Sequence, residues 1–296
     1  MLYDIRLKIT YSYDRPAIAG RHILRLMPAD LPGVQRRISG ALTIEPNPAE
    51  RRDMLDFFQN AGVEIAFREA HDEIVFEVKS RVERVAEAPS LDISPPLPQL
   101  AREIADYRGL DAQAPHHFLG ASPRTAPSSA MTAYAEEAIR PGITAFSAVC
   151  AVGEALNRDM TYDPEATDVD TPTEEAFARR HGVCQDFAQI MIACLRGIGI
   201  PAGYVSGFLR TNPPPGKPRL EGADAMHAWV RAWCGWQTGW IEYDPTNALI
   251  VGADHILIAR GRDYGDVSPV KGVLKIAGDQ KSEQAVDVLP VPEVVA

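Results

Sequence analysis

The feature that most constrains the fold is a two-residue alternation of apolar and polar side chains in the first third of the chain. In residues 2–13 the apolar members recur at Leu2, Tyr3, Ile5, Leu7, Ile9, Tyr11 and Tyr13. A period of two places successive side chains on opposite faces of a strand, which predicts that one face is buried. Similar short runs follow at 22–27, 37–44, 53–58, 63–67 and 73–82. Residues 1–86 are therefore predicted to form an antiparallel β-sandwich domain.

Proline then interrupts the alternation. Four prolines fall within ten residues, at Pro89, Pro95, Pro96 and Pro98. Because proline lacks an N–H and fixes φ, neither a helix nor a central strand continues through such a segment. We predict that residues 87–130 form a proline-rich linker with a short helix, laid over the surface.

Residues 131–296 carry a mixed pattern and are predicted to form an α+β core with C-terminal strands. Apolar steps of three and four residues, or a capping signal, predict helices over 143–158, 171–180 and 183–197. Strand-like runs follow at 202–209, 228–234, 239–243, 256–259, 272–276 and 285–289. The segment 212–224 is rich in proline and glycine and predicts a mobile loop that borders the site.

Composition excludes several classes of partner. The chain has 30 Lys and Arg against 40 Asp and Glu, a net charge of −10, so no basic field attracts nucleic acid. No apolar run reaches the length of about 18 residues that a transmembrane helix requires, so no membrane partner is expected. Charges interrupt the first ten residues, which is not the pattern of a secretory signal, and a cytoplasmic location is expected. The sequence indicates no oligomeric state.

The four cysteines, Cys150, Cys184, Cys194 and Cys234, form no Cys-x-x-Cys pair. They are too sparse for a disulfide framework, and neither a metal nor another cofactor is expected. The adjacent His116 and His117 are discounted as metal ligands because no carboxylate or cysteine lies nearby at ligand spacing. The default interpretation of each cysteine is a small buried hydrophobe.

Cys184 departs from that default. It follows Gly182, which marks a tight turn, and falls in the first turn of a predicted helix. Free N–H groups and the positive end of the helix dipole favour the thiolate there, which makes Cys184 a candidate nucleophile. Cys194 lies ten residues later on the apolar stripe of the same helix.

A cysteine nucleophile needs a base and a group that orients the base. His227 opens a predicted strand, and Asp244 closes the next one before Pro245. If the two strands form a hairpin, the start of the first lies opposite the end of the second, and the two side chains meet. The alternative interpretations are a surface histidine and a turn-initiating aspartate.

Three strings carry a family resemblance: Gly-Val-Cys-Gln-Asp-Phe-Ala, Asp-Ala-Met-His-Ala-Trp-Val and Trp-Ile-Glu-Tyr-Asp-Pro-Thr-Asn. They resemble, in order and spacing, the core motifs of the bacterial transglutaminase-like superfamily. The preceding β domain resembles the N-terminal region that accompanies this core. The later stretch that begins Asp254-His-Ile and continues from Gly261 also fits the subgroup.

The resemblance implies a papain-like fold, with a cysteine-bearing helix packed on the antiparallel sheet that bears the histidine and aspartate. It implies Cys184 as nucleophile, His227 as base and Asp244 as orienting group. The chemistry that it implies is a thioester formed from a peptide or protein amide and then passed to water or to an amine. The motifs leave open whether the enzyme is a peptidase, an amidase or a transglutaminase.

Three further residues are candidates for the oxyanion site or its surroundings. The backbone N–H of Cys184 is the natural first donor. Tyr162 is the candidate second donor, with core packing as the alternative that we favour. Gln185 and Asp186 either bond within the cleft or cap the helix.

Two other functions compete with a thiol enzyme. The first is a catalytically idle binding or scaffold protein on the same fold, with the β domain as its interaction module. The second, ranked last, is a metal-dependent hydrolase.

Overall fold

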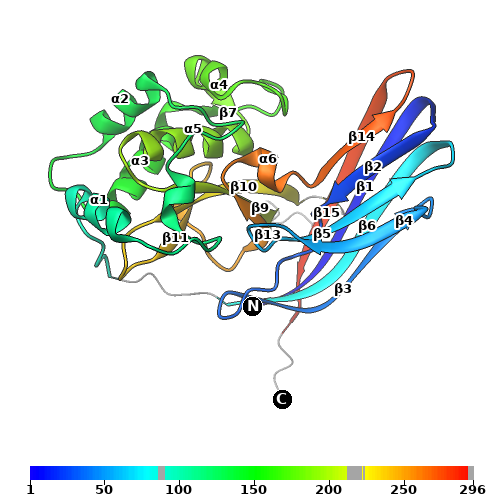
Figure 1. Cartoon of the computed structure of the whole chain (residues 1–296), viewed down its shortest axis with the longest axis horizontal. Coiled ribbons are helices and arrows are strands. Elements are labelled where there is room, and N and C mark those ends of the chain that lie inside the picture. Colours follow the sequence, from blue (N-terminus) through cyan, green and yellow to red (C-terminus); the bar gives the residue numbers. More distant parts are fainter. Residues whose placement is uncertain (86–90, 212–221, 223, 293–296) are drawn as a thin grey trace, which may run out of the picture.

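Two four-stranded antiparallel sheets pack face to face and form the β-sandwich expected for the N-terminal residues (Figure 1). The computed structural model describes residues 1–85, 91–211, 222 and 224–292. The strand orders are β15–β1–β6–β3 and β14–β2–β5–β4. Their bounds are β1 Leu2–Ala17, β2 Ala19–Leu24, β3 Gln35–Glu45, β4 Glu50–Leu55, β5 Ala61–Phe67, β6 His71–Arg84, β14 Val270–Lys275 and β15 Gln280–Pro290.

The alternation in the sequence produces the core of the sandwich directly. In β1, Ile5, Leu7 and Ile9 are buried, while the charged residues between them are exposed. Phe76 and Val78 of β6 pair across from β1 and are buried as well. Each buried side chain of this size contributes about 1.5–3 kcal/mol when it leaves water, so the strands are held mainly by this inner layer.

The last two strands belong to the sandwich, which corrects their placement in the core at residues 131–296. Strand β15 pairs with β1 from Tyr3↔Pro290 to Tyr13↔Gln280, and β14 pairs with β2. In Figure 1 the orange and red C-terminal strands lie beside the blue N-terminal ones. Without them, β1 and β2 would each present an unpaired edge, which sheets avoid.

The α+β core contains a five-stranded antiparallel sheet with helix α5 packed against it, as predicted. The sheet order is β12–β11–β10–β9–β13, and α2, α3 and α4 surround α5. Every residue of α5 from Asp186 to Leu195 is buried, so this helix is the centre of the core. The bounds are α2 Ser129–Ala138, α3 Ala145–Asp159, β7 Thr161–Tyr162, α4 Thr173–Arg179, β8 His181–Gly182, α5 Cys184–Gly197, β9 Ala202–Leu209, β10 Ala225–Trp233, β11 Trp240–Asp244, β12 Leu249–Ile250, β13 His255–Gly261 and α6 Tyr264–Val267.

The segment predicted as a linker packs against the core instead of only crossing the surface. It contains helix α1 (Leu97–Asp106) and the 3₁₀ helix η1 (Pro115–Phe118). The side chain of Gln113 accepts a hydrogen bond from Arg231, and its carbonyl accepts one from the indole of Trp240. Gln113 therefore binds both strands of the β10–β11 hairpin, and this hairpin carries part of the site described below.

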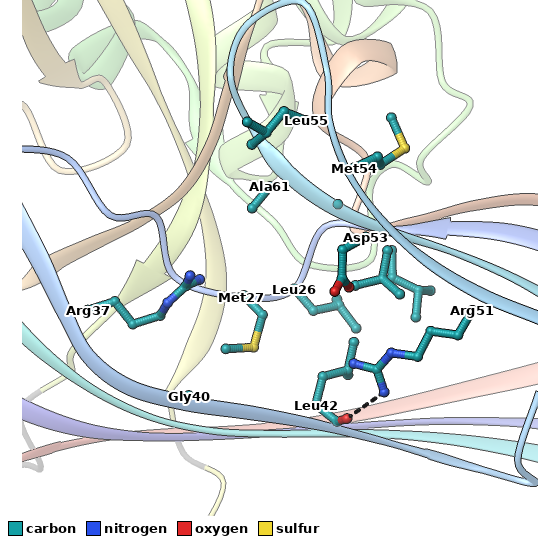
Figure 2. A pocket seen from close by; sticks show the side chains of 13 residues that line it. Leu26, Met27, Arg37, Gly40, Leu42, Arg51, Asp53, Met54, Leu55 and Ala61 are labelled. Atoms are coloured by element: carbon teal, nitrogen blue, oxygen red, sulfur yellow. Dashed lines mark hydrogen bonds between the residues drawn. The ribbon is translucent and has the colours of Figure 1, made fainter.

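A hollow of about 540 Å³ lies in the sandwich between the edge strands β3 and β4 (Figure 2). Apolar side chains line it together with Arg37, Arg51 and Asp53, and Arg51 donates to the carbonyl of Leu42. Neither a cysteine nor a histidine is among its described lining residues. None of the helices in the described ranges is long and apolar enough to cross a membrane.

Placing β15 in the sandwich generates a stability prediction. Val286 is buried opposite Leu7, so Val286→Asp puts an unpaired carboxylate into the inner layer. We expect the free energy of unfolding to fall by at least about 3 kcal/mol, measured by urea denaturation. Gln284→Asp, at an exposed position of the same strand, is the control and should change stability by less than about 0.5 kcal/mol. Equal effects of the two substitutions would contradict this placement.

Candidate active site

Cys184 is the first residue of helix α5 and is held there by a closed turn. The carboxylate of Asp186 accepts the N–H of Val183 at 2.8 Å and the hydroxyl of Thr167 at 2.6 Å. A Cβ at Gly182 would lie 2.6–2.9 Å from atoms of Asp186, so the turn requires glycine. Of the two roles considered for Asp186, the structure shows the capping role.

The helix start distinguishes Cys184 from the other cysteines. The N–H groups of a first helical turn have no helical carbonyl to bind, and they direct partial positive charge toward its side chains. Cys184 is half-buried. Burial raises the pKa of the Cys194 thiol to about 12, and burial followed by the charge of Glu154 raises the pKa of Cys150 to about 11. These two thiols therefore remain protonated at neutral pH.

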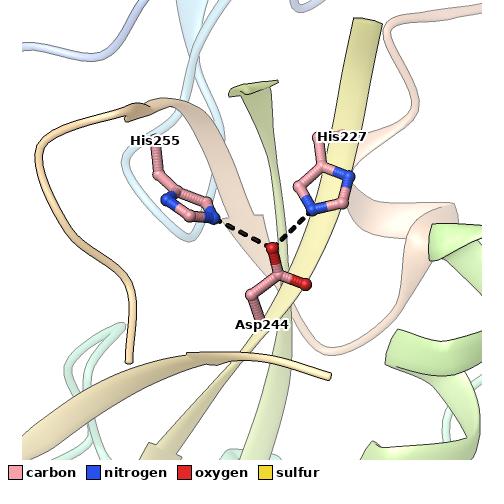
Figure 3. Close-up of side chains that lie close together, drawn as sticks. All are labelled: His227, Asp244 and His255. Carbon is pink, nitrogen blue, oxygen red and sulfur yellow. Dashed lines mark hydrogen bonds and ion pairs between the residues drawn. The ribbon is translucent and has the colours of Figure 1, made fainter. Parts of the chain in front are cut away.

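His227 and Asp244 meet at the end of the β10–β11 hairpin. Nε2 of His227 lies 2.7 Å from Oδ2 of Asp244, and both residues are buried (Figure 3). The strand pairing runs from Trp233↔Trp240 to Val230↔Tyr243 and stops before reaching His227. The predicted hairpin and the predicted contact are both present, although the two residues are not direct cross-strand partners.

The electrostatics favour a charged pair. Burial acts to lower the pKa of His227, but the hydrogen bond that its ring donates to Asp244 and the interaction with Cys184 outweigh burial and raise the pKa to about 10. Burial acts to raise the pKa of Asp244, yet its hydrogen bonds with His227 and His255 hold that pKa well below its usual range. Cys184 is thus among the groups that raise the pKa of His227.

A second histidine, which the sequence analysis did not identify as part of the site, shares this carboxylate. Nε2 of His255, at the start of β13, lies 3.0 Å from Oδ2 of Asp244 (Figure 3). Asp244 also accepts the backbone N–H groups of Thr246 and Asn247 and the side-chain amide of Asn247. The string Asp254-His-Ile was a family signal, but β13 reaches Asp244 only through its pairing with β9.

His227, Asp244 and His255 are also the one group among the described residues with the composition of a metal site. Both Nε2 atoms approach the same carboxylate oxygen, at 2.7 and 3.0 Å. These are hydrogen-bond distances, and they direct both rings at Asp244 and not at a shared empty point. The arrangement is therefore that of one carboxylate orienting two imidazoles.

Tyr162 and Gln185 lie on backbone segments next to the turn that leads into Cys184. Tyr162 pairs with Gly182 across the two-stranded β7–β8 sheet and is 55% exposed, so the alternative of core packing is wrong. Burial, and then the charge of Cys184, raise the pKa of Tyr162. Gln185 donates to the carbonyl of Val169 at 3.3 Å. The predicted bordering loop 212–224 lies outside the described residues except for Gly222 and Asp224.

Tyr204 of β9 was not identified from the sequence. It is almost fully buried, and burial followed by the charge of Cys184 raises its pKa well above the usual value. Its ring contacts that of Tyr264 edge to face, with centroids 6.0 Å apart. No local pattern in an apolar strand distinguishes such a residue from ordinary core.

Two family models match the chain. The model described as the bacterial transglutaminase-like N-terminal region matches residues 3–83, and that of the transglutaminase-like superfamily matches residues 132–245. The second match contains Cys184, His227 and Asp244.

Two relatives and one solved structure are similar to this chain. An uncharacterized protein of Mycobacterium tuberculosis (strain ATCC 25618 / H37Rv) is 35% identical over 287 residues, which is 95% of this chain and 88% of that protein. A protein-glutamine gamma-glutamyltransferase of Pseudomonas aeruginosa is 39% identical over 88 residues, 29% of this chain and 13% of that protein. The crystal structure of a candidate cysteine protease from Cytophaga hutchinsonii has the same fold, with a TM-score of 0.76 at 21% identity over 100% of this chain and 92% of that one. The chain therefore belongs to the transglutaminase-like superfamily and carries the bacterial transglutaminase-like N-terminal region.

Proposed function

We propose that the protein is a cysteine-dependent acyl-transfer enzyme that opens amide bonds through a thioester on Cys184. The observation that carries the proposal is the 2.7 Å contact between His227 and Asp244, on an imidazole that also interacts with Cys184. Nucleophile, base and orienting carboxylate in this arrangement define a catalytic triad whatever the surrounding fold. Membership of an enzyme superfamily supports the same class of reaction.

The hydrogen bond with Asp244 indicates which ring nitrogen of His227 carries the proton. Asp244 is ionised and only accepts, so Nε2 of His227 carries the proton that it donates. Nδ1 is then the nitrogen left for the thiol of Cys184. With a pKa of about 10, the imidazole is protonated at neutral pH. The reaction requires Cys184 as the thiolate, which is the nucleophilic form of a cysteine.

The reaction then proceeds in two steps. The thiolate of Cys184 attacks the amide carbon, and the carbonyl oxygen takes the negative charge. We assign its stabilisation to the N–H of Cys184 in the first helical turn and to the hydroxyl of Tyr162. As the C–N bond breaks, Nδ1 of His227 gives its proton to the departing amine or ammonia, and the thioester remains.

In the second step His227 takes a proton from water or from an amine, which attacks the thioester and releases the thiol. Water gives hydrolysis and an amine gives transamidation. The donor in this proposal is a peptide or protein amide. The Pseudomonas relative, by its name, acts on protein glutamine, so a glutamine carboxamide is the first donor to test. The cytoplasmic compartment expected from the sequence stays a prediction.

The proposal predicts an acyl adduct on one cysteine. After incubation with a library of peptides and peptide amides, mass spectrometry should find the adduct on Cys184 alone. Cys184→Ala should abolish turnover with little change in melting temperature, because the thiol is not part of the apolar centre of α5. Cys150→Ala, at another half-buried thiol, is the matched control and should keep both adduct and turnover. Equal, slow modification of all four cysteines by iodoacetamide would refute the proposal.

The charge of Asp244 predicts the pH profile. The pKa of His227 is raised, so the imidazolium persists below pH 10, and kcat/KM should fall as pH rises through about 10. Asp244→Asn removes the anion that raises this pKa, so the descending limb should move to lower pH. The profile of kcat/KM from pH 5 to 11 measures both. If the descending limb of kcat/KM falls at the same pH in the wild type and in Asp244→Asn, Asp244 is not the orienting carboxylate.

His255 provides a third prediction, because it donates to the same oxygen as His227. A hydrogen bond to a charged group contributes about 1.5–3 kcal/mol, so His255→Leu should lower kcat/KM by about ten-fold or more. His255→Gln keeps an N–H donor and should regain most of the loss, whereas a merely space-filling role would favour Leu. Equal kcat/KM for the two variants, compared at matched melting temperatures, would rule out this positioning role.

A further inference from the structure

The strand that carries His255 also borders the β-sandwich. β13 is the last strand in the order of the five-stranded sheet, so it pairs with β9 on one side only. Its outer edge lies beside the sandwich (Figure 1). Backbone N–H and C=O groups on the edge of a buried strand need partners from outside the sheet. In this protein side chains of the sandwich are those partners.

Gln35, the first residue of β3, supplies the first pair of bonds. Its side-chain N–H donates to the carbonyl of Leu257 at 2.8 Å, and its side-chain oxygen accepts the N–H of Leu257 at 2.9 Å. A side-chain amide carries the same donor and acceptor as a backbone residue, so Gln35 takes the place of a strand partner. Both residues are buried, so water does not compete for these bonds.

Asn60, in the turn between β4 and β5, repeats the arrangement at Arg260. Its side-chain amide donates to the carbonyl of Arg260 at 2.8 Å and accepts the N–H of Arg260 at 2.8 Å. Asn60 is itself held by Asp56, whose carboxylate accepts its backbone and side-chain N–H groups at 3.0 Å. A bulge between Leu257 and Ala259 shifts the strand alternation by one residue, so residues 257 and 260 both face the outer edge.

Tyr3 of β1 makes the third contact. Its hydroxyl donates to the carboxylate of Asp254 at 2.8 Å, and Arg210 binds the same carboxylate oxygen at 3.1 Å. Asp254 directly precedes His255, the first residue of β13. The contact therefore fixes the point at which this strand begins.

We call Tyr3, Gln35 and Asn60 the sandwich clamp. The clamp holds β13 at residues 254, 257 and 260, and all three of its members lie within the match to the family's N-terminal region. In the sheet order β9 and β10 separate β13 from β11, yet His255 reaches Asp244 at the end of β11. A contact across two strands depends on where the edge strand lies.

Apolar contacts act in the same direction. The ring of His255 contacts that of Trp229 edge to face, with centroids 5.2 Å apart, and Trp229 packs with Leu257 in one buried cluster. Ala29 and Leu31, from the sandwich segment before β3, pack against this cluster. The sandwich therefore supports both the backbone of β13 and the indole against which His255 lies.

We propose that the sandwich clamp makes the β-sandwich a positioning part of the active site, because it holds His255 where its imidazole donates to Asp244. This inference rests on the proposed function and deepens it by naming what keeps the site assembled. The members of the clamp are positioning residues, since they act through His255. The N-terminal region of the family thereby gains a role in catalysis in this chain.

The first experiment observes His255 itself, in the full chain labelled with ¹⁵N-histidine. The Nε2 proton that His255 donates to Asp244 should give a downfield resonance, assigned with His255→Gln. Gln35→Met keeps the length of the side chain but loses both bonds to Leu257, so this resonance should move upfield or broaden. An unchanged resonance would overturn the proposal, whatever the activity of the variant.

The second experiment is a double-mutant cycle on kcat. A displacement of about 1 Å can cost about 100-fold in rate, so the smaller shift expected in Gln35→Met should lower kcat by about ten-fold. In a chain that already carries His255→Leu, the same substitution should change kcat by less than about two-fold, because its effect passes through His255. Equal losses in the two backgrounds would make the clamp merely structural and would overturn the proposal.

Tyr3→Phe guards against misfolding, because it removes only the hydroxyl that binds Asp254. It should lower kcat in the wild-type background, at a temperature where every variant is folded. Tyr13→Phe is the matched control, since Tyr13 is another buried tyrosine of β1, and it should leave kcat at the wild-type value. Equal losses of kcat in the two tyrosine variants would show a general loosening of the sandwich and would also overturn the proposal.

Failure of the proposed function has a different signature. A wild type that forms no acyl adduct on Cys184 with any peptide would overturn the thioester chemistry, and the catalytic role of the clamp with it. A wild type that forms the adduct, with a His255 resonance that does not respond to Gln35→Met, would overturn the clamp alone.

Discussion

The buried carboxylate of Asp244 is the interaction on which the site depends. It lies at the end of β11 with no exposed surface and accepts hydrogen bonds from two imidazoles, two backbone N–H groups and one side-chain amide. A buried anion is costly unless its lone pairs are satisfied, and these five donors satisfy them. The anion in turn orients His227 and helps to raise the pKa of its imidazole to about 10, so that the ring is protonated at neutral pH.

The surrounding structure fixes the positions of the elements that carry Asp244, His255 and Cys184. The hairpin that carries Asp244 is fixed on its outer side by Gln113, from a segment that precedes the core in the chain. The strand that carries His255 is fixed by pairing with β9. The start of the helix that carries Cys184 is capped by Asp186, which accepts the N–H of Val183 and packs against Gly182. Three elements distant in sequence thus converge on one point.

Sequence reasoning succeeded where the signal was local. The glycine turn before Cys184 and the apolar periodicity of α5 and β1 are patterns within a few residues, and the structure contains the elements that they predict. The hairpin of His227 and Asp244 was also accessible, because a short connection leaves few alternatives for pairing.

The features that sequence reasoning missed are all non-local. The pairing of β15 with β1 joins the two ends of the chain, and no periodicity records which edge a strand will cover. His255 reaches Asp244 through a sheet order that the strand patterns leave open. Proline content correctly excluded a central strand at residues 95–98, but it could not show that the following residues pack on the hairpin. The side-chain exposure of Tyr162 likewise depends on its neighbours in space and not on its own strand.

The most direct measurement is the titration of His227 by NMR in protein labelled with ¹⁵N-histidine, assigned with His227→Gln. The account predicts an imidazole that stays doubly protonated through neutral pH and titrates near pH 10. A titration near the ordinary histidine value of about 6.5 would contradict the claim that Asp244 and Cys184 together hold the catalytic proton on this ring.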